Sequence, residues 1–160
     1  MSARVLITGG ASGIGAACAA RCRADGYEPV IIDRAGGDIQ ADLSDPNDTA
    51  AALEAALADG PITRLINNVG IVLPAAVEDQ SLAELDLAVS LNLRCALQCM
   101  QALLPGMRAA GFGRVVNMAS RAAYGKELRS AYSATKAGLI GMTRTWALEL
   151  GPDGITVNAV

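Results

Sequence analysis

The chain has 160 residues, of which 52% are hydrophobic and only 3% aromatic, so we expect one domain with a core of Ala, Val, Leu and Ile. Such a core is typical of helices packed closely on a parallel sheet, which favours an α/β class. The formal charge of -3 and the absence of any run of Lys or Arg argue against nucleic acid and against an anionic membrane as partners. No histidine is present, which excludes a Ser-His triad and an imidazole metal ligand.

Neither a membrane span nor a targeting leader is expected. No apolar run approaches the roughly 18 residues that a spanning helix needs. The N-terminus enters an apolar stretch without a charged and apolar leader. We therefore expect a soluble, cytoplasmic protein.

The four cysteines form two pairs at i, i+4 spacing, Cys18 with Cys22 and Cys95 with Cys99. Structural zinc sites commonly use the shorter Cys-x-x-Cys spacing, so a four-thiolate site is not favoured. We expect all four side chains to serve as small buried hydrophobes, and we expect no metal site.

A glycine-rich turn follows the first apolar run, Val5–Ile7, and residues at helical spacing continue from Ile14. This pattern predicts a strand, a turn and a helix. Gly9, Gly13 and Gly15 let the backbone turn tightly and approach a pyrophosphate, whose charge would meet free amides at the helix N-terminus. The turn is a candidate phosphate cradle, although a glycine-rich turn alone is often only a turn.

The second apolar run, Pro29–Ile32, predicts a buried strand that Asp33 closes. A carboxylate at this place accepts hydrogen bonds from a ribose 2'-hydroxyl and repels a 2'-phosphate. No Lys or Arg lies within the glycine turn, so the pattern favours NAD over NADP. Arg34 leaves the alternative open, because its guanidinium is able to accommodate a phosphate.

The connection to the third strand is unusually short. Only Ala35–Asp38 precede the apolar residues Ile39–Ala41, so we expect no crossover helix between the second and third strands. The next helix has two clear ends: Asp45-Pro46 predicts an N-cap with proline at the first helical position, and Asp59–Pro61 ends the helix.

A fourth strand is predicted at Ile62–Ile66, followed by the polar segment Asn67–Gly70. Two asparagines after a strand often only form a turn by bonding the backbone. Ser81–Glu84 is a capping box that opens one long helix. Asn92 lies among the apolar residues of that helix, so its amide is expected to face the core, where it needs partners.

The last predicted helix, Ser130–Leu150, carries Tyr132 and Lys136 on one face, because they are four residues apart. A phenol has a pKa of about 10 and exchanges protons poorly near neutrality unless a nearby cation stabilises its phenolate. Lys136 is placed to be that cation. Tyr124 is the rival phenol, but the residue four positions beyond it is Leu128.

These motifs resemble, in order and spacing, the short-chain dehydrogenase/reductase family, and the resemblance covers the whole chain. The segments that carry it are Thr8–Gly15, Asn67–Gly70, Asn92, Ser120 at the end of a fifth strand predicted at Arg114–Ala119, and Tyr132–Lys136. The resemblance implies a doubly wound parallel sheet of the Rossmann type in three α/β/α layers. The expected strand order is 3-2-1-4-5-6, with the cofactor crossing between the first and fourth strands.

The implied activity is reversible hydride transfer between NAD and a secondary alcohol or ketone. By resemblance, Tyr132 is the general acid/base, Ser120 hydrogen-bonds the substrate oxygen, Lys136 lowers the Tyr132 pKa and holds the nicotinamide ribose, and Asn92 positions a relay water. The residues implied to bind the cofactor are Gly9, Ser12, Gly13, Ile14, Gly15, Asp33, Asp42, Leu43, Asn68, Val69, Gly70, Tyr132 and Lys136. Asn67 is implied to brace the central sheet, and Tyr124 to line the substrate pocket.

The sixth predicted strand, Ile155–Val160, ends the sequence, whereas family members continue into a substrate loop, another helix and a seventh strand. We therefore expect residues 1–160 to be one nucleotide-binding domain of a longer protein. Two alternatives are a catalytically silent NAD-binding module and a fragment that serves only in assembly. Relatives pair through the two long helices, so we expect at least a homodimer. The residues expected at that contact are Leu97, Leu104, Met107, Leu139, Met142 and Trp146.

Overall fold

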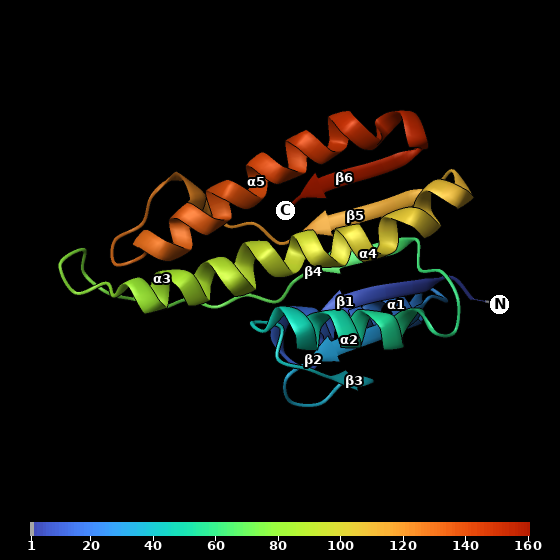
Figure 1. Ribbon diagram of the computed structural model, residues 1–160, viewed down its shortest axis with the longest axis horizontal. Coiled ribbons are helices and arrows are strands. Elements are labelled where there is room, and N and C mark those ends of the chain that lie inside the picture. Colours follow the sequence, from blue (N-terminus) through green and yellow to red (C-terminus); the bar gives the residue numbers. More distant parts are fainter. Residues whose placement is uncertain (1) are drawn as a thin grey trace.

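The computed structural model describes residues 2–160 and contains a six-stranded parallel sheet in the order β3-β2-β1-β4-β5-β6 (Figure 1). The strands are β1 (Arg4–Thr8), β2 (Glu28–Asp33), β3 (Ile39–Gln40), β4 (Arg64–Asn67), β5 (Gly113–Asn117) and β6 (Ile155–Ala159). The α-helices are α1 (Gly13–Ala24), α2 (Pro46–Leu57), α3 (Leu82–Val89), α4 (Cys95–Ala110) and α5 (Ser130–Leu150). Short helical turns are η1 (Ser90–Arg94, a π turn), η2 (Arg121–Tyr124) and η3 (Gly151–Asp153). The predicted fold class and strand order are confirmed.

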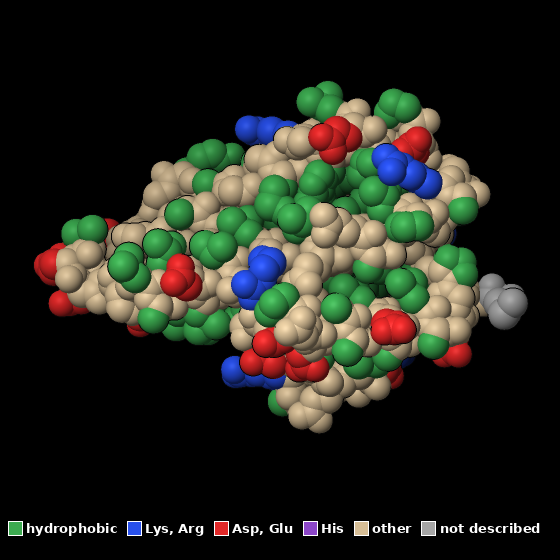
Figure 2. Space-filling view, in the orientation of Figure 1, with side chains coloured by type: hydrophobic (Ala, Val, Ile, Leu, Met, Phe, Trp, Pro, Cys, Tyr) green, Lys and Arg blue, Asp and Glu red, His purple; other side chains and the backbone are tan. Residues whose placement is uncertain are grey.

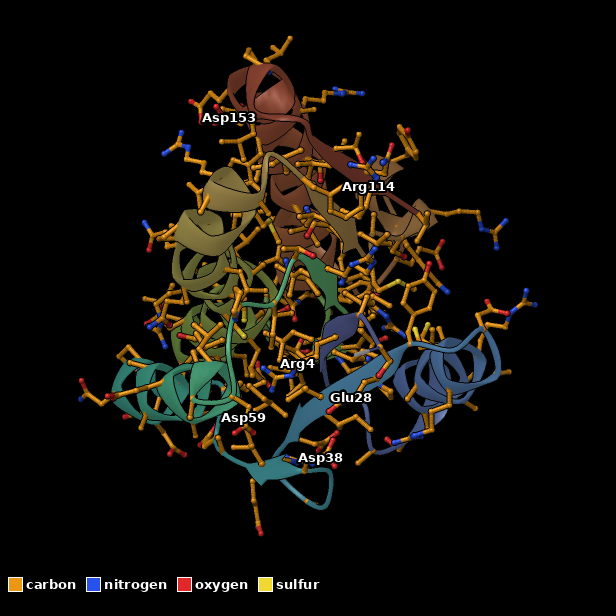
Figure 3. All side chains as sticks on the ribbon, turned by 90° about the vertical axis from the view of Figure 1, so that its right-hand side faces the viewer. Arg4, Glu28, Asp38, Asp59, Arg114 and Asp153 are labelled. Atoms are coloured by element: carbon orange, nitrogen blue, oxygen red, sulfur yellow. The ribbon has the colours of Figure 1, made fainter. Side chains whose placement is uncertain are left out.

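The helices cover the two faces of the sheet unequally. Figure 3 shows α1 on one side of the sheet and α2 and α4 on the other. Successive strand side chains point to opposite faces, so Val5, Ile7 and Ile31 form a small cluster with α1, while Leu6 and Leu65 belong to the main core under α2, α4 and α5. The main core therefore lies on the face that carries most of the helices.

The expected absence of a helix between β2 and β3 is confirmed. The five residues 34–38 connect the two strands, and Asp38 anchors them: its backbone N–H donates to the Ile31 carbonyl at 3.0 Å, and its Oδ2 accepts from the Ile31 N–H at 2.8 Å. A Cβ on Gly37 would lie 2.8 Å from Ile31 Cγ2, so only glycine fits there. The tight connection keeps β3 in register with β2.

Most predicted helix ends are confirmed. The Asp45 side chain accepts from the N–H groups of Asn47 and Asp48, and Ser81 and Glu84 form the reciprocal capping box. The start predicted for the fourth strand was wrong, because β4 begins at Arg64 rather than at Ile62. The fifth strand likewise ends at Asn117 rather than at residue 119, because the β4–β5 pairing stops at the facing pair Asn67 and Asn117.

The long helix predicted after Ser81 is interrupted by the π turn η1, which the sequence pattern did not reveal. The helical rod Leu82–Ala110 has 29 residues and a mean hydropathy of 1.3 in its most apolar window, enough by length and composition to cross a bilayer. The expectation that no segment approaches this size was therefore wrong. Met100 and Leu103 of the rod lie in the main core, so we describe it as a core helix.

The expected roles of two groups of apolar residues need correction. Met107, Leu139 and Trp146, which were expected at a subunit contact, are instead 0%, 2% and 8% exposed and belong to the main core. Cys95 and Cys99 are buried as expected. The other cysteine pair, on α1, is only half-buried against the small cluster.

Candidate active site

The glycine turn between β1 and α1 is braced from β4. The Thr8 hydroxyl accepts from the N–H groups of Asn68 and Val69, at 3.1 Å each, and Asn68 Nδ2 donates to the carbonyls of Thr8 and Gly9 at 3.1 and 2.8 Å. A Cβ on Gly15 would lie 2.1 Å from the Gly9 carbonyl oxygen, so this helix turn packs directly on the backbone of the loop. The ends of β1 and β4 are therefore held together where a dinucleotide would cross them.

A cleft of about 590 Å³ opens beside this turn, at the carboxyl ends of the strands. Of the residues predicted to bind the cofactor, it is lined by Gly9, Ser12, Asp33, Asp42, Leu43, Asn68, Val69 and Gly70. Arg34, which was considered only for its effect on the choice of cofactor, also lines the cleft, and the prediction missed the lining residues Ala41, Ser44, Ile71, Leu87 and Leu91. The remaining turn residues, Gly13, Ile14 and Gly15, lie in the first turn of α1 and do not line the cleft. Two slightly larger hollows lie elsewhere, one between α2 and α4 and one near the start of β2.

Two carboxylates stand at the β2 and β3 side of the cleft. Asp33 accepts from the Ala11 N–H at 3.0 Å through Oδ2 and from the Ala35 N–H at 3.2 Å through Oδ1, so its orientation is set by the glycine turn. Asp42 Oδ1 accepts from the Ser44 hydroxyl at 2.7 Å and from the Ser44 N–H at 2.9 Å. These bonds hold the pKa of Asp42 below its ordinary value. Asp42 therefore presents a charged acceptor to the cleft.

Asn92 lies in the π turn and is 2% exposed. Its Oδ1 accepts from the Ile71 N–H at 2.8 Å, and its Nδ2 donates to the Ile71 carbonyl at 3.1 Å and to Thr135 Oγ1 at 2.9 Å. Thr135 passes the link on, because its hydroxyl donates to the Tyr132 carbonyl at 3.0 Å. Both N–H groups of the Asn92 amide are therefore used to join η1, the chain after β4, and α5.

Lys136 is 4% exposed, and its Nζ donates to the Met118 carbonyl at 2.5 Å, just beyond β5. A Cβ on Gly70 would lie 3.0 Å from Asn92 Oδ1 and 3.5 Å from Lys136 Nζ, so a side chain there would press on the Asn92 amide and would contact the ammonium group at the cleft wall. Burial lowers the pKa of Lys136 to about 8. The lysine is thus an ammonium group at neutral pH that is held by backbone next to the cleft.

This pKa predicts a pH dependence of stability. In the unfolded chain Lys136 titrates near its ordinary 10.5, so between pH of about 8 and 10.5 the unfolded state binds more protons than the folded state. We therefore expect the free energy of unfolding to rise with pH across this window, by at most about 3 kcal/mol from this residue. Denaturant unfolding at several pH values measures it. The rise should vanish in Lys136→Met and persist in the control Lys126→Met, which removes an exposed lysine; equal slopes in the two variants would contradict the assignment.

Tyr132 and Ser120 complete the predicted group. Lys136 Nζ lies 5.6 Å from the centroid of the Tyr132 ring, within range of a favourable cation–π contact. Ser120 precedes η2, which packs against α5, and its Oγ accepts from the Ala122 N–H at 3.1 Å. The Ser120 hydroxyl proton therefore stays available to a substrate oxygen. Tyr124, in contrast, is 87% exposed.

A series of buried hydrogen bonds that the sequence did not reveal connects the strands and the helix that carry the site. Asn67 Nδ2 donates to Asn117 Oδ1 at 2.8 Å, Asn117 Nδ2 donates to Thr143 Oγ1 at 2.9 Å, and Thr143 donates to the Leu139 carbonyl at 2.8 Å. The chain ties β4 to β5 and β5 to α5. Asn67 was expected to brace the sheet, whereas no role was predicted for Asn117 or Thr143.

Comparisons with known proteins identify the family. A family model described as short chain dehydrogenase matches residues 3–160. The chain belongs to the short-chain dehydrogenase/reductase family. A curated relative, D-xylose 1-dehydrogenase of Caulobacter vibrioides, is 37% identical over 172 residues, which cover 98% of this chain and 69% of that protein.

Two solved structures superpose closely on this chain. A putative NAD(P) dependent gluconate 5-dehydrogenase from Beutenbergia cavernae, with bound NADP, has a TM-score of 0.92 at 30% identity, covering 98% of this chain and 70% of that one. A 3-ketoacyl-(acyl-carrier-protein) reductase from Brucella melitensis, complexed with NADH, has a TM-score of 0.92 at 32% identity, covering 98% and 73%. A nicotinamide cofactor is therefore supported for this chain. The close packing of the glycine turn at Gly15 and the carboxylates Asp33 and Asp42 in the cleft fit a nicotinamide dinucleotide.

Proposed function

We propose that this protein transfers a hydride reversibly between NAD and a secondary alcohol or ketone. The observation that carries the proposal is Lys136, a buried ammonium group held by the Met118 carbonyl, next to both the Tyr132 ring and the cleft wall at Gly70. An isolated buried ammonium group is costly. A structural lysine would gain more from a carboxylate partner, whereas a cation beside a phenol favours the phenolate.

In the proposed reaction the nicotinamide, when bound, supplies or accepts the hydride. Tyr132 gives its phenolic proton to the ketone oxygen as the carbon gains the hydride, or takes that proton back when the alcohol is oxidised. The Ser120 hydroxyl donates to the same oxygen, since its bond from the Ala122 N–H uses only an acceptor lone pair and leaves its proton free. Lys136 stabilises the phenolate left on Tyr132, most strongly below pH of about 8, where its amine is charged.

The test measures NADH binding and turnover separately. Our proposal requires that the protein bind NADH and oxidise or reduce at least one member of a panel of secondary alcohols and ketones. Binding without any turnover would favour the silent module, and no binding would favour an assembly fragment. The substrate is proposed as a class, because the similar proteins are named for different substrates: D-xylose, gluconate and a 3-ketoacyl-(acyl-carrier-protein).

We propose a preference for NAD over NADP, supported by the Asp33 carboxylate in the cleft. Replacing Asp33 with Ala is expected to narrow the ratio of NADP to NAD dissociation constants about tenfold or more, since a close like charge costs on the order of one decade in affinity. Titration of both cofactors measures the ratio. Asp59→Ala is the control, because Asp59 is an exposed carboxylate away from the cleft. Equal affinity of the unchanged protein for both cofactors would show that Asp33 does not select and that Arg34 compensates for it.

We also propose, as for relatives, that two copies pair through α4 and α5. Figure 2 shows hydrophobic side chains gathered over and between these helices on the face turned to the viewer. With Met107, Leu139 and Trp146 in the core, the expected contact residues that still reach the surface are Leu97, Leu104 and Met142.

A further inference from the structure

The Asp42–Ser44 segment forms one wall of the cleft, and local bonds give it its shape. Asp42 N–H donates to Asp48 Oδ2 at 2.6 Å, and Asp45 N–H donates to the Asp42 carbonyl at 3.0 Å. Together with the Ser44 bonds to Asp42, these contacts all lie within residues 42–48. They fold the segment on itself, but they do not set its distance from the opposite wall of the cleft.

Arg94 supplies a contact from outside the segment. Its Nη2 donates to the Ser44 carbonyl, and one helical turn later Gln98 Nε2 donates to the Pro46 carbonyl at 3.0 Å. Within residues 2–160 Arg94 takes part in neither ion pair, and its Nε is buried without a hydrogen-bond partner. A guanidinium always stays charged, so a half-buried one with so few partners needs an explanation.

The position of Arg94 in the π turn offers an explanation for this half-buried guanidinium. Of the five residues Ser90–Arg94, Leu91 lines the cleft, Asn92 binds Ile71 on the cleft wall, and Arg94 binds Ser44 on the facing segment. Single π turns within α-helices frequently occur at functional sites. The turn that contains Asn92 thus also reaches the Asp42–Ser44 wall through Arg94.

We propose that Arg94 is a positioning residue that holds the Asp42–Ser44 wall at the separation that the adenosine half of the cofactor requires. The inference rests on the proposed function, because it assumes that a dinucleotide occupies the cleft. Arg94 touches no cofactor atom in this proposal; it acts through the Ser44 carbonyl. It therefore sets the affinity for adenosine and leaves the nicotinamide end unchanged.

The test compares Arg94→Met with Arg4→Met. Arg4 is a matched control: it too has a buried Nε without a partner and donates to carbonyls at an end of α2, those of Ala56 and Gly60 at 2.8 and 3.0 Å. Figure 3 looks onto the amino-terminal edge of the sheet and shows Arg4 at this edge. Arg4 is not among the residues that line the cleft at the carboxyl ends of the strands. A purely structural role predicts the same result for both variants.

Calorimetric titration with AMP and fluorescence titration with NMNH and NADH separate the two halves of the cofactor. Arg94→Met is expected to weaken AMP and NADH by the same factor, about tenfold, the usual order for one hydrogen bond from a charged donor. NMNH affinity should not change, and Arg4→Met should bind all three ligands as the unchanged protein does. AMP affinity that survives in Arg94→Met, or that falls equally in Arg4→Met, overturns the inference.

A second variant and a second readout guard against loss of folding. Arg94→Lys keeps one charged donor and should lose no more than about threefold in AMP affinity, a fraction of one hydrogen bond. Hydrogen exchange of the ligand-free protein should be faster at residues 42–45 in Arg94→Met, and unchanged at the glycine turn. Unchanged exchange at residues 42–45 overturns the inference. Failure of the unchanged protein to bind NADH is a different result, because it removes the proposed function itself.

Discussion

Replacing Tyr132 with phenylalanine is expected to lower kcat by about a hundred- to ten-thousand-fold, the usual contribution of a positioned general acid or base. The ring is preserved, so its contact with the Lys136 ammonium group remains, and only the transferable proton is lost. NADH affinity should therefore stay within about twofold of the original, because the variant removes at most one exposed hydrogen bond. Steady-state kinetics with an accepted ketone and fluorescence titration with NADH measure the two quantities.

Tyr124→Phe is the matched control for this experiment. Both phenols belong to the same part of the fold, but Tyr124 lies on η2, is 87% exposed, and has Leu128 where Tyr132 has Lys136. Its replacement should alter KM at most and leave kcat nearly unchanged. If Tyr124→Phe lost its turnover while Tyr132→Phe kept it, the proton donor would be the other phenol, and the role given to Lys136 would have to be abandoned.

Replacing Gly15 with alanine is expected to reduce both the stability of the protein and its affinity for NADH, because the added methyl group clashes within the glycine turn. The new Cβ would lie 2.1 Å from the Gly9 carbonyl oxygen and 2.5 Å from Asn68 Nδ2, and these two atoms are hydrogen-bonded to each other at 2.8 Å. The methyl group must therefore separate Asn68 Nδ2 from the Gly9 carbonyl oxygen. We expect a loss of about 2–4 kcal/mol in the free energy of unfolding, from overpacking and a broken, partly buried hydrogen bond, and a loss of at least tenfold in NADH affinity.

Alanine variants of two other glycines serve as controls, because they show what replacing a glycine costs when the new methyl group meets no clash. Gly13 has φ of +53° but no atom within 4 Å of an added Cβ, so Gly13→Ala should cost only about 1 kcal/mol of backbone strain. Gly141 lies within α5 with open space around its Cβ, and Gly141→Ala should stabilise the protein by about 0.5–1 kcal/mol. Chemical denaturation ranks the three variants. A Gly15→Ala variant as stable as Gly13→Ala would show that the loop yields freely and that Asn68 does not brace it.

Features that depend on neighbours in sequence were predictable. The capping residues Asp45 and Ser81 act within three residues of themselves, and their helices begin where the pattern predicted. The helix Ser130–Leu150, which places Tyr132 and Lys136 on one face, has the predicted limits. Local hydrogen bonds and helical spacing depend on sequence separation alone, so both can be predicted from the sequence.

Partners that are distant in sequence were not predictable. Thr135 bonds Asn92 across 43 positions, Asn117 bonds Asn67 across 50, and Arg94 bonds the Ser44 carbonyl across 50. A threonine in a helix or an asparagine in a strand has many unremarkable uses, so its type carries no signal for its partner. The π turn at Ser90–Arg94 was not predictable either. One extra residue in a single helix turn leaves no apolar pattern that can be recognised in one sequence.

By itself the sequence determined the order of strands and helices, the glycine turn, the acid at the end of β2 and the tyrosine–lysine pair. Only the tertiary structure decided which apolar residues of α4 and α5 face inward. Met107 and Trp146 were expected at a subunit contact, yet they are buried in the main core, because the helices lie across a twisted sheet that covers more than one apolar stripe. The tertiary structure also lowered the pKa of Lys136, because burial is a property of the assembled layers and not of the spacing between residues.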